Sequence, residues 1–175
     1  PADGLLAGLL AANALARGTF RSLAGQRLPG VVAPVPMPDL GTGADGPAAR
    51  LARRVCLIGP EPGGVVLLSD VTSSPLSAWR QGGASRLMAA LLRAARRIGE
   101  QQAFAPNGLS LWTGVRRDFE ALLDAFREAG ALGGDRREDA FQVRCGRDTT
   151  SQSDLDNGRV RVEVTVLPAN AIERI

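Results

Sequence analysis

The sequence of 175 residues contains no histidine, no tyrosine and no lysine, so all 21 of its basic residues are arginine. Without histidine the chain can form neither a Ser-His-Asp triad nor a metal site with histidine ligands. Without lysine it can form neither a Schiff base nor the phosphate contact of a P-loop. Catalysis would have to use carboxylates, arginine, hydroxyls and two cysteines. We therefore predict that the protein is not an enzyme and binds no cofactor or metal.

The charge is also small, since 21 arginines face 18 acidic residues and leave a net charge of +3. The arginines are spread along the chain, mostly near Asp or Glu, and aromatic residues make up only 4%. Nucleic-acid-binding proteins usually cluster basic residues among aromatic ones, so we predict no nucleic-acid partner. The longest apolar run, Leu5 to Ala16, is too short to cross a bilayer, which predicts no membrane insertion.

The apolar pattern predicts an α/β fold in which helices cover a mixed β-sheet. Predicted helices occupy residues 5–16, 84–101 and 110–129, the last capped by Ser110 and ended by Gly130. Predicted strands occupy residues 55–58, 65–69, 102–105, 140–147 and 159–167, and residues 148–158 form a polar loop. Residues 1–47 form an N-terminal helix and a Gly/Pro-rich connection, and residues 48–175 form the α/β domain. Because the chain starts with Pro, we expect a fragment of a longer protein.

Four features could carry chemistry, and each has a simpler structural interpretation. Gly41 to Gly46 matches GxGxxG, but Pro47 follows it and no strand precedes it, which favours a loop. Asp154 to Gly158 lacks the spacing of a calcium loop. Cys56 and Cys145 lie far apart, form no CxxC pair and are predicted to be reduced core thiols. Four carboxylates lie beside arginines on the helix at 110–129: Asp118, Glu120, Asp124 and Glu128. Glu120, Asp124 and Glu128 are spaced four apart on its solvated side, which is typical of a surface that meets another protein or only water.

The strand at 159–167 alternates more cleanly than any other part of the chain. Val160, Val162, Val164 and Val166 alternate with Arg159, Arg161, Glu163 and Thr165, which predicts one packed face and one wet face. Such a strand near the C-terminus offers a sheet edge to which another strand can pair.

From about residue 79 onward the order of motifs resembles the C-terminal domain of phage tail sheath proteins. The motifs are Trp79-Arg80, Phe104-Ala105-Pro106-Asn107, Leu111-Trp112, Gly130-Ala131-Leu132-Gly133-Gly134, Ala140-Phe141-Gln142-Val143-Arg144-Cys145, Asp148-Thr149-Thr150, Asp154, Gly158-Arg159-Val160 and Pro168-Ala169. Before them, Asp3 to Gly8 and Arg17 to Phe20 are similar to the stretch that leads into the sheath core, with Phe20 in place of the family's Trp. The ordered set is specific although no single motif is.

The resemblance implies a structural subunit that polymerises as a homo-oligomer, in stacked helical rings around an inner tube, and contracts to drive the tube through an envelope. It implies assembly in the bacterial cytoplasm as part of a phage tail or a tail-like particle, with baseplate and terminator proteins as further partners. Terminal arms would exchange strands between subunits, and the candidate residues are Val160, Val162, Val164 and Val166. The candidates for contact with the tube are Arg116, Arg117 and Glu120.

Three other classes remain open from the residues alone. A generic α/β protein-interaction domain would share the composition and the edge strand. An enzyme based on carboxylates or arginine would need a deep pocket with converging Asp or Glu side chains. A nucleic-acid module would need its arginines on one face.

Overall fold

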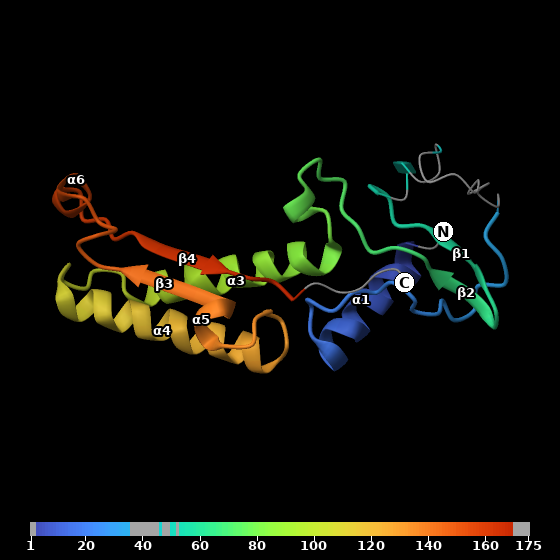
Figure 1. Cartoon of the computed structure of the whole chain (residues 1–175), viewed down its shortest axis with the longest axis horizontal. Coiled ribbons are helices and arrows are strands. Elements are labelled where there is room, and N and C mark those ends of the chain that lie inside the picture. The colour runs from blue at the N-terminus through green and yellow to red at the C-terminus, as the bar shows by residue number, and fades with distance from the viewer. Residues whose placement is uncertain (1–2, 36–45, 47–49, 52, 170–175) are drawn as a thin grey trace. The chain divides into compact units, whose positions relative to one another are not determined.

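The computed structural model describes residues 3–35, 46, 50–51 and 53–169 (Figure 1). Its helices are α1 (Asp3–Arg17), α3 (Gly82–Gln101), α4 (Leu109–Glu128), α5 (Arg137–Ala140) and α6 (Gln152–Asp156), with a 3₁₀ turn at Ser77–Trp79. Its strands are β1 (Ile58–Glu61), β2 (Gly64–Leu67), β3 (Phe141–Cys145) and β4 (Val162–Val166). The chain divides into two compact units, Pro1–Met88 and Ala89–Asn170. The boundary predicted between residues 47 and 48 lies outside the described residues.

The predicted mixture of helices and strands is confirmed, but the described strands do not form one mixed sheet. They form two separate antiparallel pairs, β1 with β2 and β3 with β4. The strands are only four or five residues long. Each pair lies in one unit, so neither sheet extends into the other.

In the first unit, β1 and β2 form a hairpin in which Ile58 pairs with Leu67 and Glu61 with Gly64. Gly63 and Gly64 have φ values of 101° and 144°, a conformation that favours glycine and allows the tight turn. We predicted that the first strand would end at residue 58, whereas it begins there. The turn residues Pro62 and Gly63 reverse the chain later than the apolar pattern suggests. Leu23, Leu28 and the three residues Val65 to Leu67 are buried around this hairpin.

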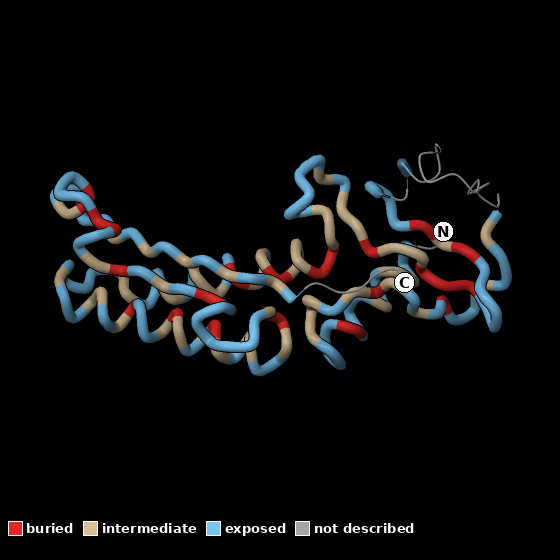
Figure 2. The backbone as a smooth tube through the Cα atoms, in the orientation of Figure 1, coloured by how far each residue is buried: buried red, intermediate tan, exposed pale blue. Residues whose placement is uncertain are grey.

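In the second unit, α4 packs on the β3–β4 hairpin through Val115 and Phe119, which are buried together with Cys145 of β3. Burial alternates along β4, as the valine pattern predicts (Figure 2). Gly130, with φ of 74°, follows α4 and confirms the predicted stop. The predicted Ser110 cap is wrong: Gly108 precedes the helix and no side chain caps it.

Two other segments of the second unit differ from the prediction. Residues 102–105 form a turn and not a strand, because the amides of Gln102, Ala103 and Ala105 each bond to the carbonyl three residues earlier. The polar segment at 148–158 contains the short helix α6. Its first turn is closed by a capping box, in which Ser151 Oγ accepts from the Asp154 amide and Asp154 accepts from the Ser151 amide.

Candidate assembly interface

One edge of β4 is unpaired within the described residues. The Leu167 amide donates to the Ala140 carbonyl at 2.9 Å, which continues the ladder between β4 and β3. In an antiparallel pair the bonded positions alternate, so Glu163 and Thr165 also face β3. The backbone N–H and C=O groups of Val162, Val164 and Val166 therefore point away from β3, toward the open edge.

The side chains of the same valines point into the unit. Val160, Val162 and Val164 pack against the buried cluster of Val115, Phe119 and Cys145, and Val166 lies half-buried opposite Phe141. The packed and wet faces predicted for this strand are thus observed. Any strand that adds here would bond to the valine backbones and not to their side chains, because the side chains are already engaged.

An ion pair that the sequence analysis missed holds the beginning of β4 in place. Arg161 donates to Asp154 through Nε at 2.8 Å and through Nη2 at 3.1 Å. The hydrogen bonds from Arg161 and then from Ser151 hold the pKa of Asp154 far below its usual value. The signal was present as Ser151-x-x-Asp154, a capping-box spacing inside a segment interpreted as a loop.

The charged residues predicted on the third helix all lie on α4. Arg116 and Arg117 are exposed, and Glu120 is half-buried beside them. Arg116 Nε lies 4.0 Å from Glu120 Oε1, and Arg117 Nη2 lies 3.6 Å from Asp118 Oδ1. These contacts are long and largely exposed, so each contributes little to stability.

Arg137 of α5 bridges two carboxylates of α4. It donates through Nε to Asp124 at 3.0 Å and through Nη2 to Glu120 at 3.4 Å. Its guanidinium also lies 4.9 Å from the centre of the Phe141 ring. The bond to Asp124 raises the pKa of Arg137, despite some desolvation that opposes the shift. Both carboxylates are thus already paired with an arginine. This arrangement fits a charged contact surface better than it fits a site of acid–base catalysis.

A second set of ion pairs crosses the wet face of the β3–β4 hairpin. Arg144 of β3 donates to Glu163 of β4 at 3.1 Å and to Asp148 at 2.8 Å. The hydrogen bond from Arg144 lowers the pKa of Asp148. This face therefore presents neutralised charge to solvent.

The predicted features with possible chemistry have different outcomes. Cys145 is a free thiol in the core, as predicted, and burial raises its pKa. Cys56 is exposed, which corrects the prediction of two core thiols. It lies where the chain enters β1, and its Sγ lies 3.3 Å from the Val71 carbonyl. All of the glycine motif except Gly46 lies outside the described residues.

Within residues 3–35, 46, 50–51 and 53–169, no three His, Cys, Asp or Glu side chains cluster closely enough to hold a metal ion. In the same part of the chain, no helix combines the length and the apolar character needed to cross a bilayer.

We compared the chain with known protein families, curated sequences and solved structures. No protein-family model and no curated protein sequence matches the chain. Among solved structures, the sheath complex of an extracellular contractile injection system, PVC, in its contracted state is 26% identical with a TM-score of 0.85, covering 97% of this chain and 48% of that one. The contracted helical sheath of the anti-feeding prophage is 24% identical with a TM-score of 0.84, covering 100% of this chain and 49% of that one.

A third structure, the six-fold symmetrised baseplate of the anti-feeding prophage, is 24% identical with a TM-score of 0.90 and covers 100% of this chain and 48% of that one. The chain thus spans about half the length of the structures it matches. The resemblance to tail sheath proteins is confirmed at the level of fold: this chain has the fold found in the sheath structures of contractile injection systems.

Proposed function

We propose that this chain is the part of a contractile sheath subunit through which neighbouring subunits join. The observation that carries the proposal is the fold shared over 97% of the chain with the PVC sheath complex, together with the open edge of β4. In this role the protein performs no catalysis. Contraction would use energy that is stored in the contacts between subunits. Storing energy in this way does not require histidine, lysine or tyrosine.

In the proposed assembly, a strand from a neighbouring subunit pairs with β4. The donated strand bonds to the outward N–H and C=O groups of Val162, Val164 and Val166, which adds a third strand to the hairpin. Main-chain bonds of this kind join a subunit to an extended segment of its neighbour and not to the neighbour's folded body. The two folded bodies can therefore rotate against each other while the bonded segment stays in place. Rings linked in this way stay connected while the sheath changes from extended to contracted.

The charged face of α4 is proposed to contact the inner tube, through Arg116, Arg117 and Glu120. Arg117 is the most exposed of the three side chains, and among the described residues it forms one ion pair, the long one to Asp118. A guanidinium held this loosely can turn toward a carboxylate of a partner at little cost. We further propose assembly in the bacterial cytoplasm, as part of a phage tail or tail-like particle with baseplate and terminator proteins.

Two substitutions at Val164 test the strand-addition step. Val164→Pro removes the outward N–H, whereas Val164→Ala removes a similar apolar contact and keeps the N–H. In the full-length protein expressed with its tube, we expect sheaths by electron microscopy for Val164→Ala and only dispersed subunits for Val164→Pro. Circular dichroism checks that both variants are folded. Sheaths of normal length from a folded Val164→Pro variant would refute strand addition at this edge.

A second measurement tests the tube contact. Arg116→Glu with Arg117→Glu reverses the face without touching the core. We expect this variant to lose co-assembly with the tube while subunits still associate with one another. Normal tube-filled sheaths would count against the proposed tube-facing role.

A further inference from the structure

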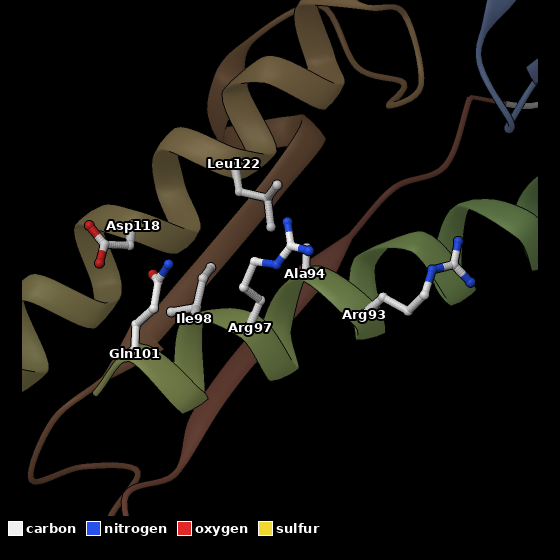
Figure 3. A pocket seen from close by; sticks show the side chains of 7 residues that line it. All are labelled: Arg93, Ala94, Arg97, Ile98, Gln101, Asp118 and Leu122. Carbon is white, nitrogen blue, oxygen red and sulfur yellow. The ribbon is translucent and has the colours of Figure 1, made fainter. Parts of the chain in front are cut away.

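A groove of about 490 Å³ lies between α3 and α4 in the second unit. From α3 it is lined by Arg93, Ala94, Arg97, Ile98 and Gln101, and from α4 by Asp118 and Leu122. Figure 3 shows Arg97, Ile98 and Gln101 pointing toward the α4 side chains. The β4 edge and the tube-facing face described above do not include this groove.

The rim of the groove carries positive charge that is not neutralised locally. Among the described residues, no carboxylate lies within 4.0 Å of the guanidinium nitrogens of Arg93, Arg96 or Arg97. The arginines of α4 differ, since Arg116 and Arg127 each have a carboxylate within that distance. Arg93 and Arg97 line the groove, and Arg96 lies beside it on the same helix; these exposed arginines repel one another and favour an anionic partner.

The floor of the groove is apolar and held in place. Ile98 packs against the buried cluster of Val115 and Phe119, and Ala94 and Leu122 are the other apolar residues of the lining. An apolar floor below a charged rim is the pattern expected where a partner buries an apolar side chain and pairs its charges around it. Asp118, which lies 3.6 Å from Arg117, adds one carboxylate on the α4 side of the groove.

The spacing of the groove fits a helix. Arg93 and Arg97 are four residues apart on α3, so their Cβ atoms lie about 6 Å apart on one face. The lining from Arg93 to Gln101 covers roughly 12 Å of helix axis, about two helical turns. A partner helix with two carboxylates four residues apart would match this spacing, and an apolar residue between them would reach the floor. Each guanidinium can take a carboxylate in a bidentate pair.

We propose that the groove between α3 and α4 binds an acidic amphipathic helix of a partner protein. A nucleic acid fits it less well, because Asp118 would repel a phosphate and none of the lining residues is aromatic. The proposal does not depend on strand addition at β4, and it assigns the α3 arginines a role in recognition.

The test uses a synthetic helical peptide of 15 residues with glutamates four apart around a leucine. A second peptide with glutamine at those positions is its control. Binding to the isotope-labelled chain is followed by amide NMR shifts, and affinity by fluorescence anisotropy. We expect the acidic peptide to shift amides around Arg93, Ile98 and Leu122 and to bind at least tenfold more tightly than the glutamine peptide, with weaker binding at high salt.

A matched pair of variants locates the site. Arg97→Glu and Arg96→Glu change the net charge equally on adjacent exposed positions, but only Arg97 lines the groove. We expect Arg97→Glu to weaken peptide binding about tenfold and Arg96→Glu to weaken it less than threefold. Equal losses from both variants, or no binding of the acidic peptide, would overturn the proposal. So would tighter binding of a duplex DNA that both variants weaken equally.

Discussion

Different interactions stabilise the interior of each of the two units. Both units bury apolar residues, but the first is also tied together by the ion pair of a buried carboxylate, Asp70, whereas most ion pairs of the second lie on its surface. In the first unit, Asp70 is 3% exposed and joins segments more than forty residues apart in the sequence. In the second, the arginine–carboxylate pairs of α4, β3 and β4 lie in solvent or at its margin, and the exception is Asp154, which is 5% exposed and binds Arg161 just before β4. In both units the buried carboxylate bonds to a segment without regular structure, Thr19 to Leu23 in the first and Arg161 in the second.

The anchor of the first unit is the pair Asp70–Arg86. Arg86 of α3 binds both carboxylate oxygens of Asp70, at 2.9 and 2.5 Å, and donates to the Thr19 carbonyl at 2.8 Å. The Leu23 amide donates to Asp70 at 2.9 Å. Gly82 allows this approach, because a Cβ there would collide with the Asp70 carboxylate. The pair thus fixes the Thr19 to Leu23 segment, which has no regular structure of its own.

The largest expected effect comes from substitutions in the two apolar cores, which can be compared directly. Leu87 in the first unit and Leu123 in the second are both completely buried. We expect Leu87→Ala and Leu123→Ala each to lower the free energy of unfolding by about 3 kcal/mol, from lost apolar burial and the cavity left behind. Each unit contains one tryptophan, Trp79 or Trp112, so single-tryptophan variants report on the units separately.

In urea titrations we expect each leucine substitution to shift mainly the fluorescence transition of its own unit. If both substitutions shift both transitions by the same amount, the two units unfold as one. The difference between their cores would then have no separate effect on stability.

The next effect concerns the anchor. Asp70→Asn leaves the Arg86 guanidinium without its buried carboxylate, and we expect a loss of about 2–4 kcal/mol. Asp148→Asn is the matched control in the second unit, since its pair with Arg144 is exposed and should contribute much less to stability than the buried pair. Urea unfolding at neutral pH measures both. Similar small losses for both variants would mean that burial does not distinguish the two pairs.

The same anchor predicts a pH dependence. Burial would raise the pKa of Asp70, but hydrogen bonds from Arg86 and the Leu23 amide outweigh it and the pKa is lowered. Its carboxylate therefore adds stability that is complete above the unfolded pKa of about 3.9 and is lost as the pH falls through the lower folded pKa. We expect wild-type stability to fall more steeply than that of Asp70→Asn between about pH 5 and 2. Parallel curves would contradict this.

The smallest effect concerns the turn between α3 and α4. Phe104 is completely exposed and has φ of 68°, a conformation that costs a non-glycine residue about 1 kcal/mol. We expect Phe104→Gly to raise the melting temperature slightly, whereas Phe104→Ala keeps the backbone cost and changes little. A melting temperature for the glycine variant at or below that of the alanine variant would show that the turn is not strained.

Part of this comparison was predictable from the sequence. The helices at 84–101 and 110–129 lie within two residues of α3 and α4, since their apolar residues recur at helical spacing. The strand at 159–167 was found from its valine alternation, although the paired part is shorter. Both signals are local, because one face of each element must meet the core.

The interfaces were less predictable because they depend on distant residues. The sequence placed Glu120 and Asp124 on a solvated helix face, but Arg137 comes from another element. The groove between α3 and α4 needs Arg97 and Asp118 on facing helices, and no spacing along the chain reports that distance.

The sequence by itself determined the chemistry that is absent, the long helices and the alternating strand, because each follows from residue type or short-range periodicity. Only the tertiary structure decided that the described strands form two separate antiparallel pairs, that none of them pairs with the outer edge of β4 and that Asp70 is buried beneath Arg86. These features depend on which surfaces meet after the chain folds. Hydrogen-bond partners and buried charges are settled by contacts across tens of residues, which local patterns do not encode.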